Sequence, residues 1–341
     1  MIKKILLCSA AAVLLIGIIL ASDYYNTYKR DNIGKETVIL IYKDYNYDSL
    51  INAIKESGAL LNFKRFEKAA KKSEFEKHFE PGRYILKPGM GNRQIIRTIS
   101  NGWQEPLRFT LRSHIRTISR LSSFLGENFE ADSAQFSQAL LNDTIYKKLG
   151  FKKETVISMF IPNTYEIYWT ISPENFIERM YKEYNNFWTP SRVEKAQSLK
   201  MTKDEIMTLA SIVNEETNNT GEMPKIAGVY INRLKRGMPL QACPTVIYAH
   251  LDTEPGIKRV LKRHLRIDSP YNTYKNKGLP PGPITIPTIK AIDAVLNYEK
   301  SNYLYFCAKP EFDGTHNFAT TYTKHQQHSR AYQKALSNLK N

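Results

Sequence analysis

The hydrophobic pattern begins with a mostly apolar run from Ile5 to Ala21 that carries no charge and is preceded by Lys3 and Lys4. A helix over this run would rise ~1.5 Å per residue and reach the short end of what spans a bilayer. The small residues near Ala21 lack the A-x-A spacing of a signal-peptidase site. The pattern therefore favours a retained membrane anchor over a cleaved signal peptide.

The charges that flank this run bear on its orientation. The preceding lysines favour a cytoplasmic N-terminus under the positive-inside rule, although Lys29 and Arg30 follow the run. We expect residues 1–22 to form a single-pass anchor in the inner (cytoplasmic) membrane and residues 23–35 to form a juxtamembrane linker. The rest of the chain would then lie outside the cytoplasm.

Beyond the linker, short runs alternate between strand-like and helix-like periodicity as far as residue 103. The predicted order is strand, helix, helix, strand and helix, carried by "TVILIYKD", "YDSLINAIKESGAL", "FKRFEKAAKKSEFEKHF", "EPGRYILKPGM" and "NRQIIRTISNG". Pro81 and Gly82 mark the turn before the second strand, and Gly102 caps the last helix. This order predicts a small α/β module.

A second region begins at residue 104 with the strand-like "EPLRFTLRS" and continues with helical patterns to about residue 200. The run "SMFIPNTYEIYW" interrupts these helices, with a turn at Pro162 and Asn163 between aromatic flanks. Polar, turn-rich motifs crowd together after residue 202, so we expect the chemistry there.

The most informative helix follows Thr202 and ends in "LASIVNEETNN". Thr202 and Glu205 have the spacing of a capping box, so the helix starts near residue 203. At about 100° per residue its apolar side chains form a stripe, and Glu216 lies about 40° from the centre of that stripe. Glu215 lies about 140° away. We therefore expect Glu216 to point toward the core and Glu215 toward solvent.

A carboxyl group on the buried face suits acid catalysis. Desolvation disfavours its ionised form and raises its pKa, and a general acid must still be protonated near neutral pH. The alternative is a structural glutamate paired with an arginine, for which Arg233 is the candidate. Helix phase alone does not decide between these two readings.

Two downstream runs could shape a binding surface. "IAGVYINRLKRGMPLQACPTVIYA" predicts a helix that stops at Gly237 and an extended stretch after it. "SPYNTYKNKGLPPGPITIP" predicts a stiff irregular segment, which is costly to order without a function. The candidates are rings that could stack on sugar faces and amides that could bond hydroxyl groups: Tyr248, Tyr271, Tyr274, Gln241 and Asn272. For any single tyrosine, ordinary packing is the alternative.

Composition narrows the classes of partner. The net charge of +16 at pH 7 calls for a polyanion or an anionic membrane surface. No zinc-finger spacing, RNP-like strand or basic heptad region points to nucleic acid, and the lysines are scattered along the chain. The cysteines have neither disulfide-framework nor zinc spacing. We expect Cys8 to be an apolar residue of the anchor, and Cys243 and Cys307 to be buried thiols.

Several runs together resemble a known family. "ASIVNEETNN", "IAGVYINRLKRGMPLQACPTVIYA", "SPYNTY", "GLPPGPI", "YLYFCA" and "GTHNF" resemble, in order and spacing, the YceG-like endolytic murein transglycosylases. The resemblance implies an α+β chain: the anchor, a LysM-like α/β module at 36–103 and a mixed α+β YceG-like catalytic domain at 104–341. The family's essential acid is the glutamate before threonine in "(E/Q)xET", which falls on Glu216. Asn214 takes the first position of that motif.

The resemblance also extends to individual binding positions. The residues that match the family's pattern are Gln241, Thr245 and Tyr248, and, in its C-terminal "HxF…H" motif, His316, Phe318 and His325. We expect Gln241, Thr245, Tyr248 and His316 to bind substrate, with structural hydrogen bonding as the alternative for a histidine. Ala242 and Cys243 depart from the family, which commonly has serine or threonine and then aspartate before "PTV". Those two positions receive no binding role.

The resemblance implies cleavage of the β-1,4 bond between N-acetylmuramic acid and N-acetylglucosamine in nascent peptidoglycan strands. This cleavage would leave 1,6-anhydro ends and terminate glycan polymerisation. Glu216 would act alone, with no metal or cofactor, and peptidoglycan synthases are candidate partners. The alternatives are a hydrolytic muramidase, with Asp268 or Glu222 as second acid, and a non-catalytic LysM-bearing cell-wall scaffold. Their products would differ: anhydro ends, reducing ends and none.

Overall fold

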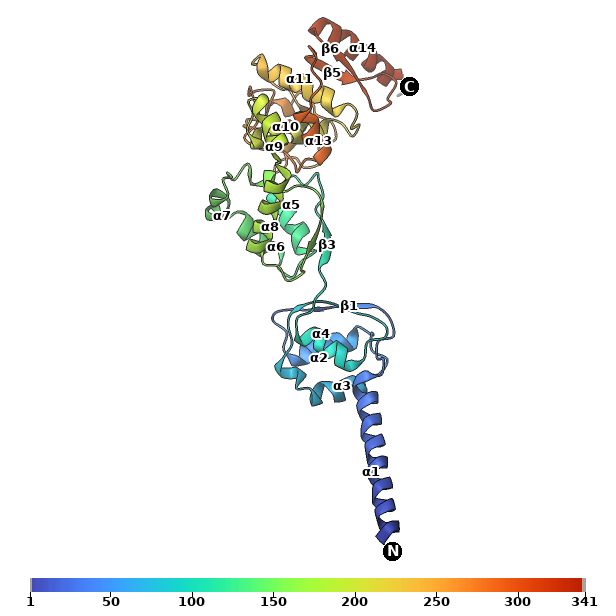
Figure 1. The fold of residues 1–341 in the computed structure, drawn as a ribbon. Helices are drawn as coiled ribbons and strands as arrows, with labels where there is room; N and C mark the ends of the chain where they lie inside the picture. Colours follow the sequence, from blue (N-terminus) through green and yellow to red (C-terminus); the bar gives the residue numbers. More distant parts are fainter. Residues whose placement is uncertain (1, 339–341) are drawn as a thin grey trace. The chain divides into compact units, whose positions relative to one another are not determined.

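The computed structural model describes residues 2–338, and its first element is an apolar helix (Figure 1). This helix, α1 (Ile2–Tyr24), runs on through a short π-helical turn, η1 (Tyr25–Lys29). The stretch Lys4–Lys29 is long and apolar enough to cross a membrane, and its most apolar part is fully exposed. Among the described residues it is the one helix that meets this test. The predicted N-terminal apolar helix is therefore present.

The chain divides into two compact units, which are described here one at a time. The first comprises Met1–Phe109, Asn128–Glu130 and Tyr165–Ile171. After η1 its elements are β1 (Thr37–Ile41), α2 (Tyr47–Glu56), α3 (Phe63–Lys72), the 3₁₀ turn η2 (Phe75–Lys77), β2 (Gly82–Leu86) and α4 (Asn92–Ser100). This is the predicted order of strand, helix, helix, strand and helix. Whether the module is LysM-like stays a prediction.

Helices cover the two-stranded sheet of the first unit. β1 and β2 pair antiparallel, with Ile39 opposite Tyr84. A two-stranded ribbon is marginally stable in water, so it needs an apolar partner. Leu50 and Ile54 of α2 and Phe66 of α3 supply that partner, and all three are fully buried in one core with Tyr84.

Residues 23–35, which the sequence predicts as a juxtamembrane linker, pack against the rest of the first unit. The turn η1 packs against α3 and α4. Asn32 is fully buried, and its amide donates hydrogen bonds to the Asn62 carbonyl at 3.0 Å and to Asn92 Oδ1 at 2.7 Å. Ile33 is also buried. Composition could not reveal this burial, because a polar segment whose hydrogen bonds are made within the protein has the same composition as one that is hydrated.

The second unit comprises Thr110–Glu127, Ala131–Thr164 and Ser172–Asn341. The strand β3 (Leu107–Thr110), at the boundary, pairs with β4 (Thr164–Ile167). The helices in this part of the chain are α5 (Ile118–Gly126), α6 (Ser133–Leu140), α7 (Asp143–Lys148), the 3₁₀ turn η3 (Val156–Met159), α8 (Pro173–Phe187) and α9 (Pro190–Ser198). The strand and helices that the sequence predicts here are thus present.

The remaining elements surround one buried helix, α10 (Lys203–Glu216). They are α11 (Met223–Lys235), α12 (Cys243–Ala249), the 3₁₀ turn η4 (His264–Arg266), α13 (Ile289–Leu296), β5 (Tyr305–Ala308), β6 (His316–Ala319) and α14 (Tyr322–Asn338). α10 packs against α11, α12 and α13, and every residue from Ile206 to Asn214 is buried. The predicted capping box at Thr202 and Glu205 is formed.

Two predictions about the stretches after α11 have different outcomes. Residues 243–249, expected to be extended, form helix α12. Pro244 lies in its first turn, where a fixed φ favours a helix and the missing N–H costs nothing. Residues 269–287 are irregular, as predicted. Gly282 permits this course, because a Cβ there would overlap the backbone oxygen of Glu154.

Candidate active site

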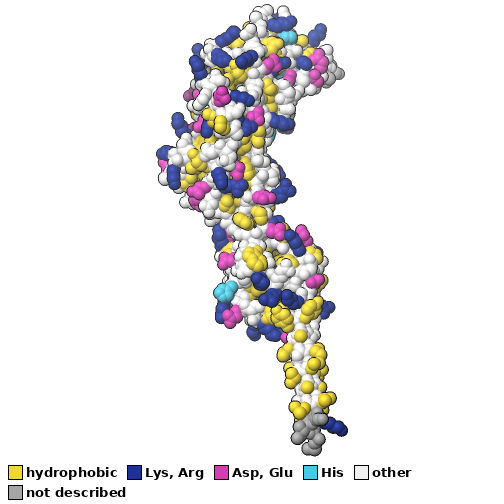
Figure 2. Space-filling model, viewed as in Figure 1, with side chains coloured by type: hydrophobic (Ala, Val, Ile, Leu, Met, Phe, Trp, Pro, Cys, Tyr) yellow, Lys and Arg dark blue, Asp and Glu magenta, His cyan; other side chains and the backbone are white. Residues whose placement is uncertain are grey.

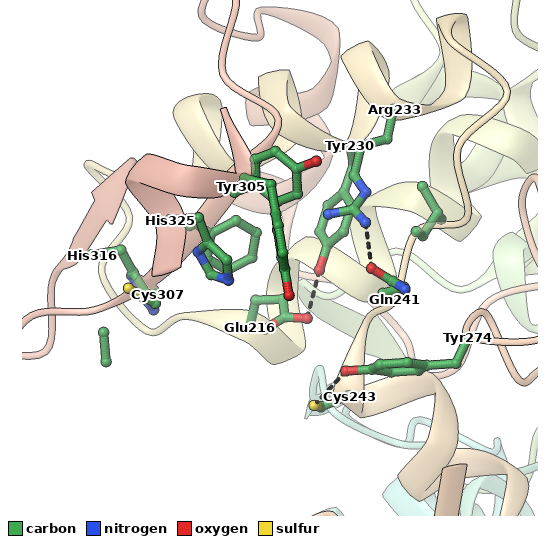
Figure 3. Close-up of a pocket in the computed structure, with 14 residues that line it drawn as sticks. Glu216, Tyr230, Arg233, Gln241, Cys243, Tyr274, Tyr305, Cys307, His316 and His325 are labelled. Carbon is green, nitrogen blue, oxygen red and sulfur yellow. Dashed lines mark hydrogen bonds between the residues drawn. The ribbon is translucent and has the colours of Figure 1, made fainter. Parts of the chain in front are cut away.

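A carboxylic acid stands at the end of the buried helix α10. Glu216 is its last residue and is partly buried, and Thr217 follows in extended conformation. The Glu216 side chain points into a cleft of about 430 Å³ (Figure 3). The Tyr230 hydroxyl of α11 donates a hydrogen bond of 2.6 Å to Glu216 Oε1.

The surroundings of Glu216 favour its protonated form. Burial is the largest cause and raises the pKa of Glu216 to about 7; the Tyr230 hydrogen bond opposes this, and the Glu215 charge adds to it. Burial and the neighbouring carboxylate also raise the pKa of Tyr230 well above its ordinary value, so the phenol stays a hydrogen-bond donor. Near neutral pH, Glu216 can therefore both give and take a proton.

Arg233 does not neutralise this carboxyl group. Its guanidinium donates to the carbonyls of Pro239 and Leu304, at 2.9 and 3.1 Å, and to Gln241 Oε1 at 2.6 Å. No ion pair joins Arg233 to Glu216 in the described part of the chain. The alternative reading, a structural glutamate paired with Arg233, is therefore wrong.

Gln241 is held in an unusual backbone conformation at the edge of the cleft. Its φ is +55°, in the left-handed region that costs a non-glycine residue of order 1 kcal/mol. The Gln241 N–H donates to the Thr273 carbonyl at 3.0 Å, and Arg233 holds its side-chain oxygen. These bonds fix the amide in the cleft lining, where a sugar hydroxyl could meet it.

Aromatic and polar side chains complete the cleft. Figure 3 shows Glu216 between the β5–β6 hairpin on one side and Tyr274 and Cys243 on the other. The hairpin and α14 contribute Tyr305, Phe306, Cys307, Ala308, His316, Tyr322 and His325. Aromatic rings with interspersed donors suit the faces and hydroxyl groups of sugars.

His316 is oriented by an acid that the sequence suggested for another role. Glu222 Oε2 lies 2.9 Å from His316 Nδ1, and Glu222 Oε1 accepts the His316 backbone N–H at 3.0 Å. Glu222 thus faces His316 and does not line the cleft. Asp268, the other acid considered for a second role, is fully exposed and lies 3.5 Å from Lys275.

Four of the predicted binding residues stand behind or beside the cleft lining. Thr245 and Asn272 are fully buried. Asn272 donates to the carbonyls of Leu265 and Ile267, and its Oδ1 accepts the Tyr274 N–H at 3.0 Å. This placement does not agree with direct sugar contact by Asn272, because its polar atoms already hold backbone groups. Tyr248 and Tyr271 pack against each other with centroids 4.6 Å apart.

Thr245 links the two loops that carry cleft residues. Its hydroxyl lies 2.8 Å from the hydroxyl of Thr273, which also accepts the backbone N–H of Ala242 at 3.0 Å. Thr245 and Asn272 therefore position Gln241 and Tyr274, and neither lines the cleft.

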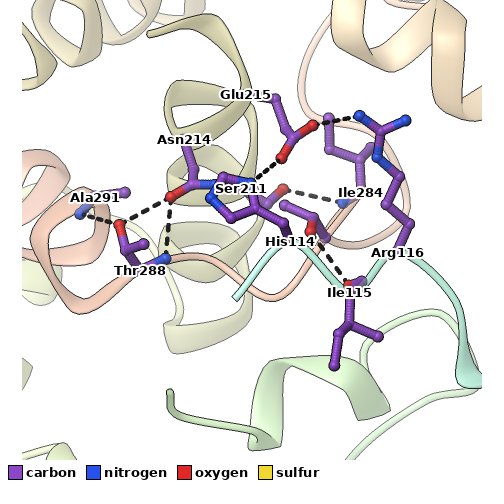
Figure 4. A network of polar contacts seen from close by, with 10 residues as sticks. His114, Ile115, Arg116, Ser211, Asn214, Glu215, Ile284, Thr288 and Ala291 are labelled. Atoms are coloured by element: carbon purple, nitrogen blue, oxygen red, sulfur yellow. Dashed lines mark hydrogen bonds and ion pairs between the residues drawn. The ribbon is translucent and has the colours of Figure 1, made fainter. Parts of the chain in front are cut away.

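The helix phase predicts that Glu215 faces solvent, but the structure largely buries its side chain. Its carboxylate receives Arg116 at 2.5 Å and lies 2.8 Å from His114 Nδ1 (Figure 4). Its side chain is only 9% exposed. Asn214 extends this network, since its Oδ1 accepts from the N–H and the hydroxyl of Thr288. A segment about a hundred positions earlier covers this helix face, which the helix sequence alone could not show.

The cysteines also differ from prediction. Cys243 is exposed and Cys307 is half-exposed, and both free thiols line the cleft. The sulfur of Cys243 lies 3.2 Å from the hydroxyl of Tyr274. The walls of the cleft partly desolvate this thiol, which is the main cause that raises the pKa of Cys243, so the thiol is protonated at neutral pH. Cys8 is an exposed residue of α1.

Sequence reasoning missed several residues of the cleft. Tyr230 and Tyr305 lie within runs quoted for the family resemblance but received no role, and His325 was noted only as part of a C-terminal pattern. A helical register for α11 would place Tyr230 on its buried side, but not against a particular carboxyl group. In the described part of the chain, no three His, Cys, Asp or Glu side chains gather as metal ligands.

Comparison with known proteins gives consistent matches. The model of the YceG-like family matches residues 39–331. The endolytic murein transglycosylase of Bacillus subtilis (strain 168) is 36% identical over 208 residues, 60% of this chain and 53% of that protein. That of Streptococcus pneumoniae serotype 2 (strain D39) is 28% identical over 304 residues, 81% of this chain and 55% of that protein. The chain thus spans about half the length of these curated relatives.

A solved structure is similar as well. The crystal structure of a YceG-like protein from Listeria monocytogenes superposes with a TM-score of 0.57 at 25% identity. The match covers 86% of this chain and 98% of that chain.

Proposed function

This chain belongs to the YceG-like family, and we propose that it is an endolytic lytic transglycosylase, a carbon–oxygen lyase that cleaves peptidoglycan glycan strands. The bond cut is the β-1,4 bond between N-acetylmuramic acid and N-acetylglucosamine. The observation that carries the proposal is the carboxyl group of Glu216, which has a pKa of about 7 and faces a cleft of sugar-binding character. The relatives described as endolytic murein transglycosylases support the same reaction.

The proposed reaction needs one acid that later acts as a base. Protonated Glu216 gives its proton to the glycosidic oxygen, and that C–O bond breaks as positive charge develops on the muramic sugar. The Glu216 carboxylate then takes the proton of the C6 hydroxyl of the same sugar, whose oxygen closes the 1,6-anhydro ring. Because the attacking hydroxyl is already tethered, proximity replaces a bound water. The phenol of Tyr230 stabilises the transient carboxylate.

The lining of the cleft supports this mechanism over hydrolysis. Glycosidases that use water or a covalent intermediate need a second carboxylate close to the first. Among the described residues, Glu216 is the one carboxylate that lines this cleft. Of the residues predicted to bind substrate, we propose direct contact for Gln241, Tyr274 and His316, and a supporting role for the others.

The remaining parts of the proposal concern the rest of the chain. We place α1 in the cytoplasmic membrane with a cytoplasmic N-terminus, residues 36–103 as a LysM-like glycan-binding module, and residues 104–341 as the catalytic domain outside the cytoplasm. A net charge of +16 suits an anionic polymer such as peptidoglycan. Peptidoglycan synthases, which make the strands, are the proposed protein partners.

Digestion of purified peptidoglycan in heavy-oxygen water, followed by mass spectrometry, tests the reaction. We expect 1,6-anhydro-muramic ends without incorporated heavy oxygen. Glu216→Gln should fold and give no product, because an amide keeps the shape but donates no acidic proton. Glu215→Gln, the same change one residue earlier, is the matched control and should cleave. Stoichiometric heavy-oxygen uptake would make the protein a hydrolase, and no product from the unaltered chain would make it a scaffold.

A further inference from the structure

Two adjoining cavities lie in the first unit where α1 meets the helices α3 and α4. The larger has a volume of about 740 Å³ and the smaller about 270 Å³. They share Tyr28, Arg93 and Arg97. The larger is further lined by Tyr24, Ser73, His78, Ile96, Ser100 and Asn101, and the smaller by Lys29, Gly89, Gly91, Gln94 and Trp103. Neither the mechanism nor the family resemblance uses these residues.

The lining of both cavities is cationic. Arg93 and Arg97 face both, Lys29 faces the smaller, and no carboxylate within residues 2–338 lines either. The nearest acid of the anchor, Asp23, is already paired with Lys68 at 2.5 Å and Lys72 at 3.3 Å. In Figure 2, Lys and Arg side chains gather on the first unit next to the apolar helix. An anion would therefore meet a positively charged lining.

Aromatic rings hold the two arginines in place. The Arg93 Nη1 donates to the Tyr24 hydroxyl at 2.8 Å, and the Arg97 guanidinium lies 5.6 Å from the centre of the Trp103 ring. Trp103 is 55% exposed, although a tryptophan is usually well buried in a folded domain. Tyrosine and tryptophan are the residues enriched at membrane–water interfaces.

The level of these cavities relative to a bilayer follows from the helix. From Ile5 to Asp23 a helix rises ~27 Å at ~1.5 Å per residue, close to the ~30 Å thickness of bilayer hydrocarbon. Tyr24 and Tyr28 follow within the next ~8 Å, which is the depth of the headgroups. Because Arg93 bonds Tyr24 and both tyrosines line the larger cavity, that cavity opens at headgroup depth.

We propose that these cavities bind the phosphate of an anionic phospholipid headgroup in the leaflet next to the first unit, at the C-terminal end of α1. The proposal rests on the proposed membrane anchoring of α1, and not on the proposed glycan chemistry. An arginine fork matches the geometry of a phosphate, and two arginines at one cavity can hold one phosphate together. The serine, asparagine and tyrosine groups of the lining can bond the remaining headgroup oxygens.

The full chain in a non-ionic detergent, titrated with short-chain phosphatidylglycerol or phosphatidylcholine, tests the proposal by native mass spectrometry. We expect phosphatidylglycerol to bind at least about tenfold more tightly, since each basic residue near an anionic headgroup contributes about fivefold. Arg93→Gln with Arg97→Gln should weaken phosphatidylglycerol binding about 30-fold. The matched control, Lys35→Gln with Arg83→Gln, removes the same charge from the first unit outside both cavities and should change it less than about twofold.

Further variants and a competition experiment distinguish the remaining explanations. Arg93→Lys with Arg97→Lys keeps the charge but loses the fork, and should bind with intermediate affinity; it replaces the glutamine pair if that pair does not fold. If the glutamine double variant and its control bind phosphatidylglycerol equally weakly, the effect is diffuse electrostatic attraction and the proposed site is wrong. Displacement of the lipid by an equal concentration of inorganic phosphate would overturn its assignment to a lipid. Glycan cleavage is measured on the same preparations as a separate readout, because, among the described residues, these cavities share no lining residue with the cleft that carries Glu216. Failure of the lipid site is therefore distinguishable from failure of the proposed enzyme.

Discussion

Removal of one oxygen atom, in Tyr230→Phe, tests the link between the site geometry and its chemistry. The Tyr230 side chain is almost fully buried, and its ring packs edge-on against Phe306 with centroids 5.8 Å apart. Phenylalanine keeps this packing. The variant therefore loses only the hydroxyl group that donates to Glu216 Oε1 at 2.6 Å.

The size of the effect follows from the strength of that bond. A hydrogen bond to a charged group contributes about 1.5–3 kcal/mol, and about 1.4 kcal/mol corresponds to one pKa unit. The bond stabilises the Glu216 carboxylate and lowers its pKa against the effect of burial. Without it, the pKa should rise from about 7 by roughly one to two units.

A pH–rate profile of kcat/KM for glycan cleavage measures this change. The general acid must be protonated, so the rate falls as pH rises through the pKa of Glu216. In Tyr230→Phe this fall should move upward by roughly one to two pH units. The plateau below it should also drop, because a weaker acid donates its proton more slowly, but by less than about 100-fold.

Tyr305→Phe is the matched control, since Tyr305 also lines the cleft but, in the described part of the chain, forms no hydrogen bond with Glu216. It could change KM and should leave the position of the fall unchanged. A Tyr230→Phe profile that coincides with the unaltered one, or moves to lower pH, would refute the assignment of Glu216 as the acid whose pKa Tyr230 controls.

Three further substitutions follow from the same contacts. Glu216→Gln should stabilise the fold at pH 8 and not at pH 4. Because the pKa of Glu216 is raised from 4.5 to about 7 in the folded chain, its ionisation lowers the folding stability by at most about 3 kcal/mol as pH rises through this range, and the amide removes that loss. Calorimetry of both proteins at the two pH values measures the difference. Glu215→Gln should lower the melting temperature, since a neutral amide weakens the pair with Arg116 by about 1–3 kcal/mol, while turnover per folded molecule stays the same; lost turnover at full stability would contradict this. Asn272→Ala should cost about 2–4 kcal/mol of stability through three lost bonds; unchanged melting with strongly reduced turnover would restore it as a sugar ligand.

Features that depend on neighbours in the chain were accessible from the sequence. The capping box at Thr202 and Glu205 fixed the start of α10, and the helical period placed Glu216 toward the interior. The order of strands and helices in the first unit was also readable, because the periods of 2 and 3.6 and the Pro81-Gly82 turn are local signals. The packing of its polar entry segment was not predicted, because the buried amide of Asn32 is satisfied by partners distant in the chain.

The details of the site were decided by segments that meet only in the folded chain. The sequence supplied Glu216, but its hydrogen bond with Tyr230 depends on how α10 and α11 pack, and the aromatic wall comes from the β5–β6 hairpin. Arg116 covers Glu215, which by its own helix phase belongs in solvent. Period and capping act over a few residues, whereas burial, which sets pKa values and the partners of polar groups, is a property of the whole packed unit. The sequence by itself therefore determined which residue could be the acid, and only the tertiary structure decided what surrounds it.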